Sequence, residues 1–188
     1  MAQEIEIEFK NLLTKDEFEL LLNQLPFPTG SVTQTNYYFE TKDFLLRQKQ
    51  AALRIRHKNN SYTLTLKQPH PEGLLETHDQ LTKEEAECWI KGNIIPQTET
   101  SIQLKDLGIP QEELRCFGHL LTKRTEMRYN NTIVVLDKSI YNNQVDFELE
   151  VEANDYQAGL EVFNKLLTTY QIDKKPTPNK IERFFATL

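Results

Sequence analysis

Acidic side chains recur at every second position in two segments of the sequence. Residues 4–10 read EIEIEFK, and residues 146–152 read DFELEVE. Side chains two positions apart share one face of a β-strand, so each segment predicts a strand with one acidic face and one apolar face. Hard divalent cations prefer such grouped carboxylate oxygens as ligands. If the two acidic faces lie close together, they form a site for a divalent metal ion.

Basic side chains alternate in the same way, but in other segments. One face of ALRIRHK (52–58) carries Arg54 and Arg56, TLTLKQ (63–68) contains Lys67, and TKRTEMR (122–128) contains Arg124. A solvated antiparallel sheet also alternates polar and apolar residues, but like charges side by side are unfavourable there. Arg and Lys clusters bind phosphate oxygens. The separation of the two charge signs by strand therefore favours a metal-bound polyphosphate as ligand.

The strand signals predict an α+β fold. They lie at residues 4–10, 34–41, 52–58, 61–68, 74–81, 120–129, 131–139 and 145–153. About eight strands joined mostly by tight turns predict an antiparallel barrel, and a barrel of this size holds only side chains or one small ligand. The predicted fold is thus an eight-stranded antiparallel β-barrel, or tunnel, with a charged interior and helices flanking it outside.

Helix signals lie between and after these strands. Residues 14–17 (TKDE) and 82–85 (TKEE) both match a capping box, which predicts that helices begin there. Apolar spacing predicts a helix over 156–172, and Thr177 and Pro178 suit the N-cap and first position of a last helix. Short helical pieces with Gly and Pro between them predict a small helical insertion around 82–119.

Composition excludes several classes of protein. The 188 residues carry a net charge of −6, which argues against nucleic-acid binding through a broad basic surface. No run of about 18 apolar residues predicts a membrane helix, and the first residues lack the apolar segment of a secretion signal. Cys88 and Cys116 match no metal or redox spacing. We therefore expect a cytoplasmic protein with reduced thiols, as a monomer or homodimer.

Other polar residues have weaker signals. Glu76 and His78 share one face of LLETHDQL (74–81), where a solvated strand face explains them as well as a site does. Asp137 follows the apolar run TIVVL, at the expected end of a strand, and both interpretations remain open. Lys180 and Arg183 lie three positions apart on one helical face, which a solvated helix also explains.

Several of these runs resemble one protein family. EIEFK resembles the ExExK signature of the CYTH superfamily, whose members are also called triphosphate tunnel metalloenzymes. Runs that resemble other family segments follow in order: YYFET, LRIR, LTLK, TKRTEM, VVLD, FELEVE and NKIER. The signature alone is common, but its combination with these runs is specific. The resemblance covers nearly the whole chain and implies a single domain over residues 1–188.

The resemblance also implies roles for individual residues and a need for Mg²⁺ or Mn²⁺. The implied metal ligands are Glu6, Glu8, Glu148 and Glu150, with Glu152 and Asp137 as further candidates. The implied phosphate-binding residues are Lys10, Arg54, Arg56, Lys67, Arg124, Lys180 and Arg183. Catalysis is expected to depend most on Glu6, Glu8, Lys10 and Glu150. Glu76 matches the family's middle acidic strand less clearly.

The family resemblance implies a small anionic substrate. Its members hydrolyse inorganic triphosphate, thiamine triphosphate or RNA 5′-triphosphate ends, or convert ATP to cAMP. The cyclases carry a histidine shortly before ExExK, whereas only MAQE precedes it here. Hydrolysis of inorganic triphosphate is therefore the favoured prediction. An adenylate cyclase, or a nucleoside or thiamine triphosphatase, is the alternative within the fold, and a non-enzymatic polyphosphate or nucleotide sensor is the alternative of another class.

Overall fold

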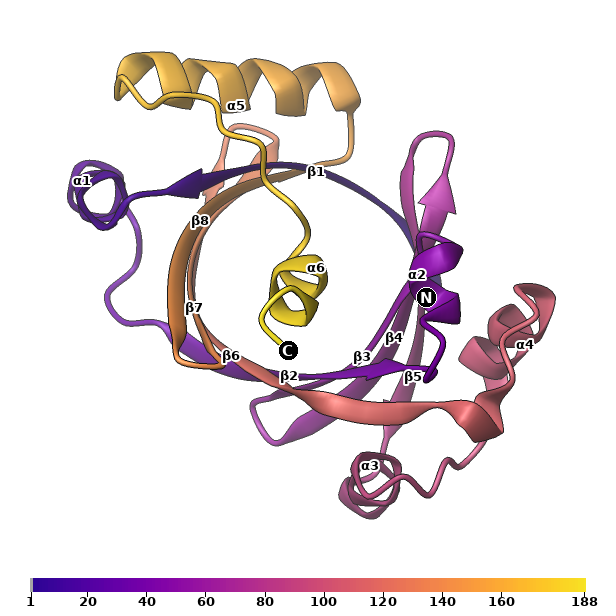
Figure 1. The fold of residues 1–188 in the computed structure, drawn as a ribbon. Helices are drawn as coiled ribbons and strands as arrows, with labels where there is room; N and C mark the ends of the chain where they lie inside the picture. The colour runs from indigo at the N-terminus through magenta and orange to yellow at the C-terminus, as the bar shows by residue number, and fades with distance from the viewer. Residues whose placement is uncertain (1) are drawn as a thin grey trace. The chain divides into compact units, whose positions relative to one another are not determined.

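The structure is a computed structural model that describes residues 2–188. Its eight strands form a closed antiparallel barrel in the order β1-β5-β4-β3-β2-β6-β7-β8, with each element labelled in Figure 1. The strands are β1 (Gln3–Leu13), β2 (Val32–Glu40), β3 (Ala52–Lys58), β4 (Ser61–His70), β5 (Gly73–Leu81), β6 (Arg115–Tyr129), β7 (Thr132–Tyr141) and β8 (Gln144–Ala153). The fold class predicted from the sequence is confirmed.

The chain divides into two compact units, each built from separate segments. The first unit contains the residues up to 5 and residues 34–120, and the second contains residues 6–33 and 121–188. The first unit holds most of β2 and all of β3 to β5, with α2 (Leu45–Gln48), α3 (Lys83–Ile90), α4 (Thr98–Asp106) and a 3₁₀ turn (Gln111–Glu113). The second holds most of β1 and β6, all of β7 and β8, and α1 (Lys15–Gln24), α5 (Tyr156–Thr169) and α6 (Lys180–Phe185).

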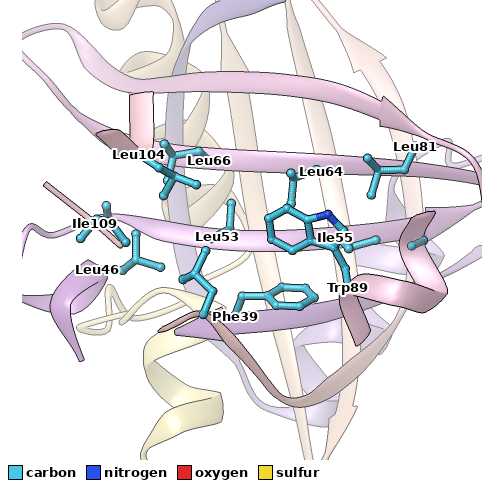
Figure 2. Close-up of a cluster of buried hydrophobic side chains, with 13 residues drawn as sticks. Phe39, Leu46, Leu53, Ile55, Leu64, Leu66, Leu81, Trp89, Leu104 and Ile109 are labelled. Atoms are coloured by element: carbon cyan, nitrogen blue, oxygen red, sulfur yellow. The ribbon is translucent and has the colours of Figure 1, made fainter. Parts of the chain in front are cut away.

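The first unit buries the apolar face of its sheet (Figure 2). Leu53 of β3 lies opposite Leu66 of β4, and both are fully buried. Trp89 of α3 is also fully buried and packs edge-on against Phe39 of β2, with 5.4 Å between ring centroids. The Trp89 indole Nε1–H donates to the carbonyl of Ile95 at 2.9 Å, so its polar atom is satisfied. Truncating such a residue to Ala costs about 3–5 kcal/mol.

The stretch predicted as a helical insertion contains α3, α4 and the 3₁₀ turn. Its last residues, from Arg115 onward, belong instead to β6, which begins five residues earlier than the pattern indicated. Trp89, Leu104 and Leu114 from this stretch are all fully buried in the core of the first unit. The stretch is therefore part of that core.

Two β-hairpins have a pair of asparagines as their turn residues. Asn59 and Asn60 join β3 to β4 with φ of 50° and 60°, and Asn142 and Asn143 join β7 to β8 with φ of 42° and 62°. Two successive left-handed residues match the right-handed twist of the flanking strands, and asparagine tolerates this region better than most residues. Both turns fix the register of the strands that carry the charged residues.

The second unit carries helices on both sides of its sheet. On the apolar side, Leu149 and Val151 of β8 pack with Phe163 and Leu166 of α5. Figure 1 shows α5 and α6 on opposite sides of β1 and β8. The helix α6 therefore lies on the charged face of this sheet.

The start of α6 was predicted wrongly. The N-cap is Asn179, which forms a capping box with Glu182, so neither Thr177 nor Pro178 begins the helix. The Thr177 hydroxyl instead accepts a hydrogen bond from the backbone N–H of Leu12 at 2.9 Å and donates to the carbonyl of Lys175 at 3.0 Å. Thr177 thus ties the segment before α6 to strand β1, a tertiary contact that local sequence does not reveal.

Candidate functional site

Strand β8 places two carboxylates on the charged face of the second unit. Glu148 and Glu150 are 1% and 3% exposed. The strand register sets Glu148 opposite Asp137 of β7 and Glu150 opposite Lys10 of β1, so groups far apart in sequence share one surface. Asp137 is fully buried. Buried carboxylates are unfavourable unless cations or hydrogen bonds compensate them, so their partners define the site.

The helix α6 supplies two of these cations. Lys180 Nζ lies 3.0 Å from Asp137 Oδ2 and 3.1 Å from Glu148 Oε1, and it also pairs with Glu150. Arg183 Nε donates to Asp146 Oδ2 at 3.0 Å, and its Nη2 donates to Glu148. Both side chains project from one face of the helix because they are three positions apart. In this state they bind protein carboxylates.

Strand β6 supplies the third cation, Arg124. Its guanidinium donates two parallel hydrogen bonds to Asp137, from Nε to Oδ1 at 2.9 Å and from Nη2 to Oδ2 at 2.7 Å. It also pairs with Glu150 and, at 3.3 Å, with Glu152. This bidentate geometry is the strongest form of an arginine–carboxylate pair. Arg124 therefore holds three carboxylates of the site in fixed positions.

The pKa values of these groups shift in different directions. Burial raises the pKa of Glu148 to about 7, a shift that Lys180 opposes and Glu150 reinforces. For Glu150 burial acts in the same direction, but attraction to Lys180 and Arg124 outweighs it and holds the pKa well below its usual value. For Lys180 burial favours the neutral form, yet Glu150 and Asp137 hold the pKa well above the ordinary range. Glu148 thus titrates near neutral pH beside Glu150 and Lys180, which stay charged.

Strand β1 adds Glu6 and Glu8 to the same face. Glu8 lies opposite Glu152 in the register, and its Oε1 is 3.3 Å from Lys10 Nζ. Two groups of three carboxylates bring ligand atoms within 4.8 Å of one another: Glu6, Glu8 and Glu152, and Glu8, Glu148 and Glu150. A set made only of carboxylate oxygens suits a hard cation such as Mg²⁺ or Mn²⁺. The predicted metal ligands on β1 and β8 are therefore brought together.

The first unit carries its own group of polar residues. Arg54 and Arg56 lie on β3, on the face opposite to the apolar core. Lys67 of β4 pairs with the buried carboxylate of Glu76 on β5. His78 Nε2 lies 3.5 Å from Glu76 Oε2, so the two residues left open by the sequence analysis contact each other.

Three polar residues of these surfaces carried no assigned role in the sequence analysis. Asp146 accepts hydrogen bonds from Arg183 and, at 2.8 Å, from the hydroxyl of Tyr141. Burial raises the pKa of Tyr141 to about 12, and Asp146 adds to the shift. In the first unit, Asn36 accepts a hydrogen bond from Arg56. Asp146 shares the phase of Glu148, so the alternation in β8 could have identified it, whereas nothing in the sequence distinguishes Tyr141 or Asn36.

The sequence model of the CYTH domain matches residues 4–185. This chain belongs to the CYTH domain family. The match covers both acidic segments and α6, so the family membership extends to all parts of the site in the second unit. The predicted resemblance is confirmed.

Known proteins similar to this CYTH domain carry two kinds of name. A protein of Bacillus subtilis (strain 168) named "Putative triphosphatase YjbK" is 45% identical over 186 residues, which is 98% of this chain and 96% of that protein. The crystal structure of a protein from Bacillus halodurans, described as a "putative adenylate cyclase", is 44% identical, with a TM-score of 0.95 over 98% of this chain and 100% of that one.

A more distant solved structure shares the fold. The protein HpAC1 from Hippeastrum is 23% identical, with a TM-score of 0.78 over 97% of this chain and 96% of that one. That protein is described as a "putative adenylyl cyclase" with "a dominant triphophatase activity". Among residues 2–188, no helix combines the length and the apolar character needed to cross a bilayer.

Proposed function

We propose that this CYTH domain hydrolyses a phosphoanhydride bond of a triphosphate, with inorganic triphosphate as the preferred substrate. One observation carries the proposal. Buried carboxylates of β7 and β8 are interleaved with Lys180, Arg183 and Arg124 on one surface, which offers ligands for a cation and for phosphate oxygens side by side. The identity to a relative named as a triphosphatase supports this assignment.

We propose Glu6, Glu8, Glu148, Glu150 and Glu152 as the ligands of Mg²⁺ or Mn²⁺, with Asp137 as a further candidate. The all-oxygen donor set supports this choice, because these ions prefer carboxylate oxygens. When bound, such an ion neutralises phosphate charge and polarises a phosphoryl oxygen. Asp137, already held by two hydrogen bonds from Arg124, orients that guanidinium toward the remaining acids.

The basic residues have a separate task. Phosphoryl transfer needs positioned cations that stabilise charge on the equatorial oxygens, and Arg and Lys provide them. We assign this role to Lys10, Arg124, Lys180 and Arg183 in the second unit. The family resemblance extends it to Arg54, Arg56 and Lys67 in the first unit. Each assignment is tested by mutation on its own.

The direct test is phosphate release from tripolyphosphate with Mg²⁺ or Mn²⁺. We expect Glu8→Gln and Arg56→Ala each to lower kcat/KM by about 10²–10³-fold, the usual loss when one electrostatic contact to a transferring group is removed. Matched controls are Glu19→Gln, whose side chain is 54% exposed, and Arg47→Ala, which is also exposed. Both controls should retain wild-type activity. Full activity in Glu8→Gln and Arg56→Ala would refute the site assignment.

An adenylate cyclase is the second candidate, because the crystal structure from Bacillus halodurans carries that description at 44% identity. Product analysis with ATP separates the two activities. A cyclase yields cAMP and pyrophosphate, whereas a triphosphatase yields ADP and phosphate. Tight binding of tripolyphosphate without turnover under any metal would instead indicate a sensor.

We further propose a single cytoplasmic domain that acts as a monomer or homodimer. Cys88 and Cys116 are both free thiols, which agrees with a reducing compartment. Sedimentation of the purified protein distinguishes the two oligomeric states.

A further inference from the structure

The charged face of the first unit contains an asparagine beside two arginines. Asn36 of β2 lies opposite Arg56 of β3, and Arg54 lies two positions along the same strand face. Asn36 is buried, with only 1% of the residue exposed. A buried carboxamide normally has all its polar atoms bonded, so the partners of Asn36 indicate its task.

The two polar atoms of Asn36 differ in their partners. Its Oδ1 accepts a hydrogen bond from Arg56 Nε at 3.0 Å. Because arginine Nε can only donate, this contact fixes which end of the amide is the oxygen. Within residues 2–188, Asn36 Nδ2 is buried and has no hydrogen-bond partner. The same holds for Nε of Arg54 across that described range.

These atoms define the missing group. Asn36 Nδ2 and Arg54 Nε are both donors, so the group that completes them must accept hydrogen bonds. Two guanidinium groups stand on the same face, so an anionic acceptor is favoured over a neutral one. Phosphate oxygens meet both requirements. A structural role alone, in which Asn36 only orients Arg56, explains Oδ1 but leaves Nδ2 unexplained.

We propose that Asn36 is a substrate-binding residue that donates its Nδ2–H to a phosphate oxygen of the triphosphate while its Oδ1 orients Arg56. The assignment rests on the proposed function, since it names a further ligand of the same substrate. It adds a neutral donor to a set otherwise made of cations. A neutral amide forms a directional hydrogen bond to one phosphate oxygen, whereas a cation is attracted mainly by the total charge of the phosphate groups.

The decisive variant is Asn36→Asp. The replacement keeps an oxygen for Arg56 but turns the unbonded donor into an acceptor. Binding of inorganic tripolyphosphate is measured by calorimetry in EDTA, where no metal-dependent turnover consumes it. We expect the Kd to rise by roughly 10–100-fold, the range for losing a hydrogen bond to a charged acceptor. An unchanged Kd would show that Asn36 only positions Arg56 and would overturn the proposal.

A matched variant separates the lost donor from the added charge. Thr63 of β4 lies opposite Arg56 on its other side, so Thr63→Asp adds the same charge beside the same arginine without removing an Asn36 donor. We expect its Kd to change by less than about threefold, as for a weakly coupled surface charge. Equal losses in Thr63→Asp and Asn36→Asp would mean that charge alone acts, which overturns the proposal.

A measurement on the wild-type protein does not depend on how the variants fold. The side-chain NH₂ resonances of Asn36 are followed by NMR during titration with tripolyphosphate in EDTA. They should shift downfield as a new hydrogen bond forms, and stationary resonances at saturation would overturn the proposal. Hydrolysis by the wild type is assayed separately with metal present. If the enzyme is active but the Asn36 resonances do not shift, only this inference is refuted. If the Asn36 resonances shift but the protein hydrolyses no tripolyphosphate, only the proposed reaction is refuted.

Discussion

Replacing Lys180 by methionine tests the charge balance of the acidic surface. Lys180 is the cation shared by Asp137, Glu148 and Glu150. Methionine keeps a long unbranched side chain but removes the ammonium group. The three carboxylates then remain buried with less positive charge beside them. We therefore expect Lys180→Met to destabilise the metal-free protein strongly.

The expected size follows from the burial of the group. The Lys180 side chain is 13% exposed, and its partners Asp137 and Glu148 are 0% and 1% exposed. Removing one partner of a buried ion pair costs about 3–5 kcal/mol, because the other charge is left uncompensated. In a protein of this length each kcal/mol corresponds to about 2–4 °C in Tm. The metal-free variant should therefore unfold about 6–20 °C below the wild type.

A divalent cation should reverse much of this loss. It binds the carboxylates that Lys180 neutralises, and ligand at a hundred times its Kd adds about 2.7 kcal/mol of stability. Since Lys180 no longer competes for Glu148 and Glu150, Mn²⁺ should raise the Tm of the variant more than that of the wild type. Calorimetric unfolding in EDTA and in excess MnCl₂ measures both effects.

The control is Lys83→Met, which removes an exposed ion pair to Glu87 at 3.8 Å. An exposed pair contributes less than about 1 kcal/mol, so the control should unfold close to the wild type. Two results would refute the reasoning. One is a metal-free Lys180→Met protein as stable as the control, and the other is an equal Mn²⁺-induced rise in variant and wild type.

Two further predictions follow from the same structure. Because burial raises the pKa of Glu148 to about 7, its carboxyl holds a proton below that pH and must release it to bind a cation. Mn²⁺ affinity measured by calorimetry should fall roughly tenfold per pH unit below about 7, and an equally steep fall in Glu148→Gln would count against this assignment. In α5, a Cβ at Gly159 would lie 2.7 Å from both Ala153 Cβ and Phe9 Cε2. Although alanine usually stabilises a helix relative to glycine, Gly159→Ala should lower the free energy of unfolding by about 1–3 kcal/mol, and a denaturant midpoint at or above the wild type would contradict this.

Local signals in the sequence identified most of the regular structure. Thr14 and Glu17 form the predicted capping box at the start of α1, with both reciprocal hydrogen bonds present. The asparagine pairs at 59–60 and 142–143 form two of the tight turns that the spacing of the strand signals predicted. These features depend on residues within three or four positions of one another, which is the range that sequence patterns describe.

Elements fixed by distant contacts were missed. The short helix α2 begins at Leu45, after Phe44 in the left-handed region at φ of 56°. The buried carboxylate of Glu40 accepts hydrogen bonds from the backbone N–H groups of Leu46 and Arg47, at 3.0 and 2.9 Å. Four residues carry too weak a periodicity to predict a helix, and a cap six or seven positions away lies outside the usual patterns.

The acidic half of the site was easier to predict than its cations. Strand alternation requires Glu148 and Glu150 to share a face, whatever surrounds them. The contacts of Lys180 depend instead on where α6 lies, and α6 is placed by a segment tied to β1 through Thr177 and Asn11. The three-residue spacing of Lys180 and Arg183 predicts that they share one face of the helix. It does not predict which surface of the protein that face contacts.

The ion pairs of α6 bear on the predicted phosphate-binding role of Lys180 and Arg183. Lys180 stabilises negative charge in either role, whether the charge belongs to the metal-binding carboxylates or to a phosphate group. When a cation binds Glu148 and Glu150, it neutralises part of their charge and weakens their attraction to Lys180. The ammonium group can then bind another anion. We therefore expect cation binding to increase the affinity for tripolyphosphate, and Lys180→Met to weaken this coupling. The coupling is measured as the change in the Kd for tripolyphosphate between Mn²⁺ at levels that support no hydrolysis and no Mn²⁺. An equal change in the variant and the wild type would show that Lys180 does not bind phosphate.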